Sequence, residues 1–349
     1  MIKPIRVLIA DDSKVSTQLL TSILEESTNI KVIGQAIDGV EAVRLTKQLK
    51  PDLITMDINM PNMDGIEATR IIMEECPTPI IIISSHSNNH IAENSFNALQ
   101  AGALSIIEKP QSILDKNFKE AKQFIINSIL TLAEVPVVTR RPNTSLKKIV
   151  SPPKLRQSFK ILALGCSTGG PSALNCILKH LPANFNIPIV ITQHITKGFL
   201  DGLINWLQHN TPLKIEIAKH NQFLEPGHVY FAPDNTHLTV GNSLKPIAIL
   251  MDGTAIDHFK PSANMLFSSI AKSYPDSAIG GLLTGMGHDG AEGLLQMKKA
   301  GCYTFAQSEA TSVIFGMPST AIKMQAVDEI LDLEQIATFL LKTCKGGAR

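Results

Sequence analysis

Short apolar runs alternate with longer segments of helical periodicity over the first third of the chain. Such runs, with few polar positions inside them, are typical of strands that are buried on both faces of a sheet. The predicted strands are Ile5–Ala10, Ile30–Ala36, Leu53–Met56, 80–83 and Ser105–Glu108. Because five strands alternate with five helical segments, we expect a parallel, doubly wound sheet of the flavodoxin-like type.

The same alternation returns from Phe159 onward. Strands are predicted at 161–165, 189–194, 214–218, 247–252, 278–286 and 302–306, with helical stretches such as 170–181 and 261–274. A second doubly wound α/β domain, Rossmann-like, is therefore expected. The turn-rich tetrapeptide 233–236 separates the apolar segments 228–232 and 237–240, and it predicts a hairpin at one edge of the sheet.

Residues 134–158 break the pattern, with four prolines and six basic residues. This composition predicts an extended, basic linker. A chain of 349 residues is also longer than one hydrophobic core usually serves. We therefore expect a first domain at 1–133, a linker at 134–158 and a second domain at 159–349.

Composition and charge exclude several classes of protein. Hydrophobic residues make up 44% of the chain and charged residues 18%, which excludes disorder. The formal net charge is +1, so no global field attracts nucleic acid or an anionic membrane. No apolar run is long enough to span a bilayer, and the first one ends at Asp11 and Asp12, unlike a secretory signal, so we expect a cytoplasmic protein. Five cysteines without a C-x-x-C pair indicate neither a disulfide framework nor a zinc knuckle.

Polar residues follow four strands of the first predicted sheet. Asp11 and Asp12 follow the first strand, Asp57 the third, Ser84 the fourth and Lys109 the fifth. The carboxyl ends of parallel strands meet at one edge, where doubly wound sheets bind their ligands. Clustered carboxylates repel one another unless a hard cation lies among them, which predicts an Mg²⁺ site.

A carboxylate beside Mg²⁺ can attack a phosphoryl group, and Asp57 is the best-placed nucleophile. Lys109 and the Ser84 hydroxyl would then bind the new phosphoryl oxygens. The plainer interpretation is that acids at strand ends cap the following helices, as Asp64 would do for the helix at Gly65–Glu75. That interpretation explains one aspartate more easily than it explains the whole set.

The order of these residues, with Met60-Pro61-Asn62-Met63-Asp64-Gly65 after Asp57, resembles the receiver domain of two-component response regulators. The resemblance covers residues 1 to about 130. It implies that a histidine kinase phosphorylates Asp57, that Ser84 and Lys109 sense the phosphoryl group, and that Mg²⁺ is required. The implied metal ligands are Asp11, Asp12, Asp57 and the backbone carbonyl of Asn59. Ile106 departs from the family, in which an aromatic residue often changes rotamer on activation.

A glycine-rich turn follows the first strand of the second predicted domain, with the sequence Gly165-Cys166-Ser167-Thr168-Gly169-Gly170-Pro171. Glycines allow a sharp turn, and the amino terminus of the next helix offers free N–H groups. The turn therefore predicts either a phosphate cradle or a nucleophile elbow of the G-x-S-x-G type with Ser167 at its apex. Cys166 stays open as a rival nucleophile.

Two further residues sit where a base and a carboxylate are needed. The strand at 189–194 delivers His194 at its carboxyl end, and the strand at 278–286 leads into Asp289. His288 is an alternative base and Asp252 an alternative carboxylate. The plainer role of Asp289 is to cap the helix that begins near Ala291. A Ser, His, Asp chain order also differs from that of the α/β-hydrolases.

The glycine-rich turn, Gln193-His194, Thr284-Gly285-Met286-Gly287-His288-Asp289-Gly290 and Phe315-Gly316-Met317-Pro318 resemble the catalytic domain of chemotaxis protein-glutamate methylesterases, from about 160 to 345. The resemblance implies a phosphorylation-activated hydrolase that demethylates receptor glutamates and deamidates specific glutamines, without a cofactor for the esterase chemistry.

Ser167 would be the nucleophile, His194 the general base and then acid, and Asp289 the orienting carboxylate, with Thr168 and Met286 lining the site. The implied partners are chemoreceptors as substrates and a chemotaxis histidine kinase, with neither nucleic acid nor membrane insertion. Asp234 departs from the family, which often has glycine there, and this difference concerns the shape of a loop.

Two other functions compete. A receiver joined to a DNA-binding domain is common, but an α/β pattern without a basic recognition helix does not resemble a helix-turn-helix. A nucleotide-binding or interaction module could use the glycine-rich turn without chemistry, but the turn lacks the lysine of a P-loop and the G-x-G-x-x-G spacing. Both are therefore less favoured than the esterase.

Overall fold

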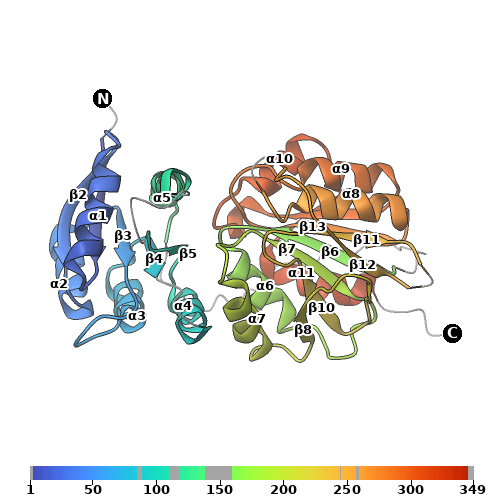
Figure 1. Cartoon of the computed structure of the whole chain (residues 1–349), viewed down its shortest axis with the longest axis horizontal. Helices are drawn as coiled ribbons and strands as arrows, with labels where there is room; N and C mark the ends of the chain where they lie inside the picture. The colour runs from blue at the N-terminus through green and yellow to red at the C-terminus, as the bar shows by residue number, and fades with distance from the viewer. Residues whose placement is uncertain are drawn as a thin grey trace. The chain divides into compact units, whose positions relative to one another are not determined.

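The computed structural model of the chain describes residues 3–84, 89–110, 118–137, 159–243, 245–256 and 259–344. The chain separates into two compact units, residues 1–144 and 145–349, each an α/β domain, as predicted (Figure 1). Most of the expected linker, 138–158, lies outside the described residues, so its extended form stays a prediction. None of the described helices is both long and apolar enough to cross a membrane.

The first unit contains a five-stranded parallel sheet in the order β2-β1-β3-β4-β5. Its strands alternate with helices on both faces, and α1 and α5 lie on the face opposite α2, α3 and α4. The elements are β1 (Ile5–Ala10), α1 (Lys14–Glu25), β2 (Ile30–Ala36), α2 (Gly39–Leu49), β3 (Leu53–Met56), α3 (Gly65–Glu75), β4 (Ile80–Ser84), α4 (Asn89–Ala101), β5 (Ser105–Glu108) and α5 (Phe118–Leu132). The five predicted strands are confirmed.

The strand order of this sheet reverses between β1 and β3. The chain runs outward from β1 to β2 in one direction and from β3 to β5 in the other, which leaves the ends of β1 and β3 uncovered by a crossover. Every residue of β3 is buried, as expected of a central parallel strand. The residues that follow β1 and β3 therefore face the place where doubly wound sheets bind their ligands.

The second unit contains a seven-stranded parallel sheet in the order β15-β14-β13-β6-β7-β10-β8 and a three-stranded antiparallel sheet, β11-β12-β9. Helices α6, α7 and α11 pack on the opposite face of the large sheet from α8, α9 and α10. The strands are β6 (Ile161–Cys166), β7 (Ile189–Gln193), β8 (Lys214–Ile217), β9 (Gln222–Phe223), β10 (His228–Phe231), β11 (His237–Gly241), β12 (Ile247–Met251), β13 (Ala278–Leu282), β14 (Tyr303–Gln307) and β15 (Glu329–Leu331). The helices are α6 (Gly170–Leu178), α7 (Leu200–Gln208), α8 (Ala263–Ser273), α9 (Ala291–Lys299), the 3₁₀ turn η1 (Glu309–Thr311), α10 (Met317–Lys323) and α11 (Leu333–Thr343).

The predicted hairpin around 233–236 is wrong. β10 lies inside the parallel sheet, where it pairs with β7 and β8, whereas β11 pairs with β12 in the antiparallel sheet. The predicted strand at 247–252 likewise belongs to the antiparallel sheet. Turn residues mark the place where the chain reverses, but strand pairing is decided by packing between distant segments.

β6 lies at the centre of the large sheet, between β13 and β7. These three strands deliver their carboxyl ends side by side, with Gly165 in register with Thr192 on one side and with Leu282 on the other. β13 ends at Leu282, earlier than predicted, and a loop carries the chain from there to α9. The turn after β6, the end of β7 and this loop meet at one edge of the sheet.

Candidate functional sites

The first site lies at the ends of β1 and β3. One carboxylate oxygen from each of Asp11, Asp12 and Asp57 falls within 4.8 Å of the others. Asp11 and Asp57 are buried, whereas Asp12 is exposed, so the cluster is open to water on one side. Mg²⁺ prefers few carboxylates with retained water, and this donor set fits it.

Lys109 brings a positive charge to the acidic cluster. Its Nζ lies 2.7 Å from Oδ2 of Asp11 and 3.3 Å from Oδ2 of Asp57. The pKa of Asp57 is raised to about 6, mainly by burial and also by the charge of Asp11, although the charge of Lys109 lowers it. A single ammonium therefore does not compensate the cluster, and a divalent cation would complete its charge.

The other residues predicted for this site follow the same strand ends. The carbonyl of Ser84 accepts a hydrogen bond from the backbone N–H of Lys109 at 2.9 Å, which ties together the two predicted phosphoryl-sensing residues. Asn59 is exposed in the loop after Asp57, and Ile106 is half-buried on β5. Asp64 caps α3, as the plainer interpretation predicted, by accepting a hydrogen bond from the N–H of Glu67 at 2.8 Å.

Gly65 keeps the loop after β3 tight. A Cβ at this position would lie 2.0 Å from the carbonyl oxygen of Asp57, a distance that no side chain can occupy. The N–H of Gly65 also donates to the carbonyl of Ile58 at 2.9 Å. The backbone of Asp57 is therefore held by direct contact with the start of α3.

The second site is built around the turn after β6. The N–H of Ser167 donates to the carbonyl of Thr284 at 3.1 Å, and the Thr284 hydroxyl donates to the carbonyl of Thr168 at 3.0 Å. The N–H of Gly170 closes the turn on the carbonyl of Ser167 at 2.8 Å. Ser167 and Thr168 are half-buried at its apex, directly before α6. The loop after β13 therefore braces the turn at two points.

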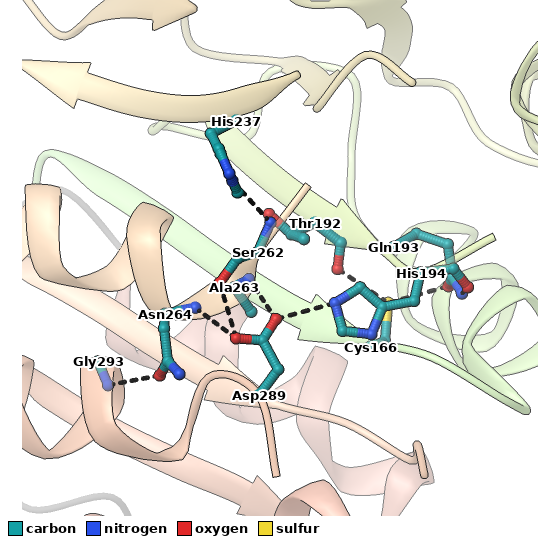
Figure 2. Close-up of polar contacts among 10 residues, drawn as sticks. All are labelled: Cys166, Thr192, Gln193, His194, His237, Ser262, Ala263, Asn264, Asp289 and Gly293. Atoms are coloured by element: carbon teal, nitrogen blue, oxygen red, sulfur yellow. Dashed lines mark hydrogen bonds and ion pairs between the residues drawn. The ribbon is translucent and has the colours of Figure 1, made fainter. Parts of the chain in front are cut away.

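His194 and Asp289 come together at the same edge of the sheet. Nε2 of His194 lies 2.9 Å from Oδ2 of Asp289, and both side chains point toward one another in Figure 2. Nδ1 of His194 is buried and has no hydrogen-bond partner among the described residues. The ring stacks on Phe259, with centroids 4.2 Å apart and planes 8° apart.

Asp289 is fully buried, and it caps a helix other than the predicted one. The N-cap of α9 is Gly290, whereas Asp289 binds the start of α8. Oδ2 accepts from the N–H of Ala263 at 2.6 Å, and Oδ1 accepts from the N–H of Asn264 at 3.1 Å and from the Ser262 hydroxyl at 2.8 Å (Figure 2). The positive end of the α8 dipole therefore faces this carboxylate.

These contacts set the charge of Asp289. Burial alone would raise the pKa of this carboxyl, but the hydrogen bond and charge of His194 and the donors on Ala263 and Ser262 hold it below its usual value. Asp289 is therefore ionised and can only accept hydrogen bonds. Because it accepts from Nε2 of His194, that nitrogen carries the proton, and the buried Nδ1 keeps a free lone pair.

The alternative residues fit a catalytic role less well. Cys166 is fully buried at the end of β6, and burial raises the pKa of its thiol, which disfavours the thiolate. Asp252 is exposed beyond β12, in the antiparallel sheet rather than the parallel one. His288 is exposed, whereas the neighbouring Asp289 is buried. Met286 is half-buried, one residue after Gly285, where a Cβ would lie 2.8 Å from Cβ of Ser167.

Several residues of this site escaped the sequence analysis. Thr284 and Gln193 were inside recognised blocks but had no assigned role, and Ser262 and Phe259 had none either. Ser262 lies inside the helical stretch predicted at 261–274, whereas the structure begins α8 at Ala263 and makes Ser262 its N-cap residue. Asp234 contributes too, because its carboxylate accepts from the N–H of Gly198 at 2.8 Å and so ties down the loop after His194. These roles depend on contacts between distant segments, which no local pattern reports.

Comparison with known proteins assigns each of the two units to a family. Residues 162–340 match the CheB methylesterase family, and residues 7–116 match the response regulator receiver domain family. The chain is 44% identical over 346 residues to protein-glutamate methylesterase/protein-glutamine glutaminase 1 of Syntrophus aciditrophicus (strain SB), with 97% of this chain and 98% of the relative covered. It is 38% identical over 349 residues to protein-glutamate methylesterase/protein-glutamine glutaminase 4 of Myxococcus xanthus (strain DK1622), with 99% and 98% covered.

A solved structure matches the second unit. The crystal structure of the Thermotoga maritima CheB methylesterase catalytic domain is similar, with a TM-score of 0.52 and 33% sequence identity. The match covers 53% of this chain and 99% of that chain. The similarity therefore extends over nearly the whole of that catalytic domain.

Proposed function

Because the chain belongs to the family of protein-glutamate methylesterases/protein-glutamine glutaminases with a receiver domain, we propose that it hydrolyses glutamyl methyl esters of chemoreceptors. Specific receptor glutamines would be deamidated at the same site, since ester and amide share the tetrahedral intermediate. Phosphorylation of Asp57 would control this activity. The substrates would lie on the cytoplasmic side of the membrane, where we place this protein.

The observation that carries the proposal is the contact of His194 with Asp289, together with its unpartnered Nδ1 among the described residues. Asp289 holds the proton on Nε2, and Nδ1, without a partner among the described residues, is left as the basic nitrogen of the ring. In the proposed reaction, Ser167 Oγ attacks the ester carbonyl and passes its proton to Nδ1. The imidazolium then returns that proton to the leaving methoxide, which departs as methanol.

Water completes the cycle. It attacks the acyl-enzyme, gives a proton to Nδ1 and releases the glutamate as the serine is reprotonated. The oxyanion of each tetrahedral intermediate would be stabilised at the amino terminus of α6, next to Thr168, and by the segment around Met286. Phe259 stacks on one face of the imidazole and would keep water away from that face during the reaction.

In the receiver unit, Asp57 would accept a phosphoryl group from a histidine kinase. Asp11, Asp12, Asp57 and the backbone carbonyl of Asn59 would hold Mg²⁺, which when bound would neutralise the charge that develops on the phosphoryl oxygens. Lys109 would bind a phosphoryl oxygen directly, and Ser84 would bind another. The linker at 134–158 would couple the two units, and with Ile106 in place of an aromatic residue the signal would leave the site through other contacts.

The decisive experiment is methanol release from methylated receptor membranes. The parent should release methanol, and Ser167→Ala should lower kcat by at least about 10³-fold. A serine-reactive phosphonate should label Ser167 in the parent. Equal release by parent and Ser167→Ala, or labelling of Cys166 alone, would refute the assigned nucleophile.

A small-molecule phosphodonor tests the switch. It should stimulate the parent in the presence of Mg²⁺ and leave Asp57→Asn at its basal rate. Removal of Mg²⁺ with a chelator should abolish the stimulation but not the basal activity. Full stimulation of Asp57→Asn would contradict phosphorylation control.

A further inference from the structure

The side chain of Gln193 links the turn that carries Ser167 to the backbone of His194. It is the last residue of β7 and is only 4% exposed. Its Nε2 donates to the carbonyl of Ser167 at 2.9 Å and to the carbonyl of His194 at 2.8 Å. Its Oε1 accepts from Sγ of Cys166 at 3.0 Å. The Gln193 amide thus donates one hydrogen bond to the turn that carries Ser167 and one to the backbone of His194. The distance between these two segments sets the distance between the proposed nucleophile and base.

The two catalytic side chains have no such link of their own. Among the described residues, no hydrogen bond joins the side chains of Ser167 and His194, and Nδ1 of His194 has no partner. The N–H of His194 donates to the carbonyl of Cys166 at 2.9 Å, which continues the sheet ladder. Beyond this point the sheet ends, and the Gln193 amide is the next connection between the turn and His194.

The start of α6 leaves room for this amide. A Cβ at Gly170 would lie 2.2 Å from Oε1 of Gln193 and 3.0 Å from Cβ of Cys166. The φ angle of Gly170 is not in the left-handed region, so glycine is needed there for space rather than for backbone conformation. Asp289, in contrast, is held by donors at the start of α8 rather than by the amide.

We propose that Gln193 is a positioning residue that sets the distance between the nucleophile and the base. It acts through the backbone carbonyls of Ser167 and His194 and does not touch the substrate. The inference rests on the proposed function, because it concerns the rate of that reaction. A misplacement of about 1 Å at a reacting centre can lower a rate by about 100-fold.

The test compares Gln193→Met with Gln208→Met in the full-length chain. Methionine has a similar shape but donates no hydrogen bond. Gln208 is a matched control, since its amide also bonds the backbone. Its Nε2 donates to the carbonyl of Leu213 at 2.9 Å and its Oε1 accepts from the N–H of Ile215 at 2.8 Å, and neither contact involves Ser167, His194 or Asp289. Gln193→Met should lower kcat and the rate of phosphonate labelling by about 10- to 100-fold, with KM unchanged. Gln208→Met should leave both rates unchanged.

A double-mutant cycle between Gly170 and Gln193 separates the positioning effect from any loss of stability of the protein. Gly170→Ala should lower kcat in the parent because the new methyl group displaces the amide, although alanine is the better helix former. In a Gln193→Ala background the same change should have little further effect, which gives a coupling between the two positions. Additive effects on kcat, or a Gln193→Met variant that labels as fast as the parent, would overturn the inference.

Failure of the proposed function would look different. If the parent releases no methanol, or releases as much as Ser167→Ala, the esterase assignment fails and the role of Gln193 falls with it. If the parent is active, Ser167→Ala is inactive and Gln193→Met retains the full rate, only the positioning role is refuted.

Discussion

A single proton decides whether His194 can act as a base. It lies on Nε2 because the neighbouring carboxylate of Asp289 is ionised and can only accept. The fully buried position of Asp289 would favour a neutral acid, and the hydrogen bond and charge of His194, together with the donors of Ala263 and Ser262 at the start of α8, reverse that preference. The contacts at the start of α8 therefore favour the ring tautomer that the proposed mechanism requires.

Asp289→Asn should lower kcat by about 10³- to 10⁴-fold. An amide N–H facing Nε2 would shift the ring proton to Nδ1 and remove the base, while the size of the side chain stays the same. Methanol release measures the loss, and the fluorescence of Trp206 shows whether the domain remains folded. Retained activity in the Asp289→Asn variant would show that the carboxylate does not set the tautomer.

Phe259 stacks on the face of the His194 imidazole. Phe259→Leu should lower kcat/KM by about 2- to 10-fold, because aromatic pairs contribute about 0.5–1.5 kcal/mol beyond buried area. Phe259→Tyr keeps the aromatic face and should restore the parental value. A leucine variant as active as the parent would show that the stacking has no catalytic consequence.

At the scale of elements, α8 is the helix that positions the carboxylate. Its N-cap residue, Ser262, does not cap its own helix but donates its hydroxyl to Asp289. The N–H of Ser262 in turn donates to Nδ1 of the buried His237 at 3.2 Å, and Nε2 of His237 lies 3.1 Å from the carbonyl of Thr254. A chain of hydrogen bonds thus runs from the loop after β12 to Asp289.

Ser262→Ala should lower the free energy of unfolding of the second unit by about 1.5–3 kcal/mol, since it removes a hydrogen bond to a charged group. Ser273→Ala is the matched control on the same helix, because the Ser273 hydroxyl donates to a neutral carbonyl, that of Val240, at 2.9 Å. Its expected loss is smaller, about 1 kcal/mol. Urea unfolding followed by Trp206 fluorescence measures both, and equal losses would contradict the role assigned to the charge.

At the scale of the whole molecule, the two units can be distinguished by spectroscopy. The single tryptophan and all three tyrosines, Trp206, Tyr230, Tyr274 and Tyr303, belong to the second unit. Fluorescence therefore reports on the esterase unit alone, whereas far-ultraviolet circular dichroism reports on both. An unfolding transition that changes only the dichroism belongs to the receiver unit.

The separate signals of the two units allow a pH test of Asp57, the proposed phosphoacceptor. The raised pKa of Asp57, about 6, means that the folded receiver binds this proton more tightly than the unfolded chain does. The protonated Asp57 therefore contributes to the stability of the folded receiver fully below about pH 4, and this contribution is lost as the pH rises through about 6. In Mg²⁺-free buffer, Asp57→Asn should therefore stabilise the receiver at pH 7.5 by on the order of 2 kcal/mol, and the gain should disappear near pH 4.

Asp12→Asn is the control for this measurement, since Asp12 is exposed and its charge is solvated. It should change the stability of the receiver less than Asp57→Asn does. An Asp57→Asn receiver that is no more stable than the parent at pH 7.5 would show that the charge of Asp57 does not destabilise the folded receiver.

The sequence by itself determined the strands of the receiver, the α/β class of both units and the segments that carry chemistry. Buried parallel strands are short apolar runs, so their positions are visible locally, and the residues after them lie at the ligand-binding edge of the sheet. Asp57, Ser167, His194 and Asp289 could be selected as candidates for this reason alone.

Only the tertiary structure decided how those residues are paired and held. β10 and β11 were expected to form a hairpin, yet they joined different sheets, because pairing depends on packing across the whole domain. Asp289 was expected to cap α9, but it binds α8, 25 to 27 residues away in the sequence. The Gln193 amide likewise reaches Ser167 across 26 residues. Such contacts form between segments that fold together in space, and no local pattern of residues encodes them.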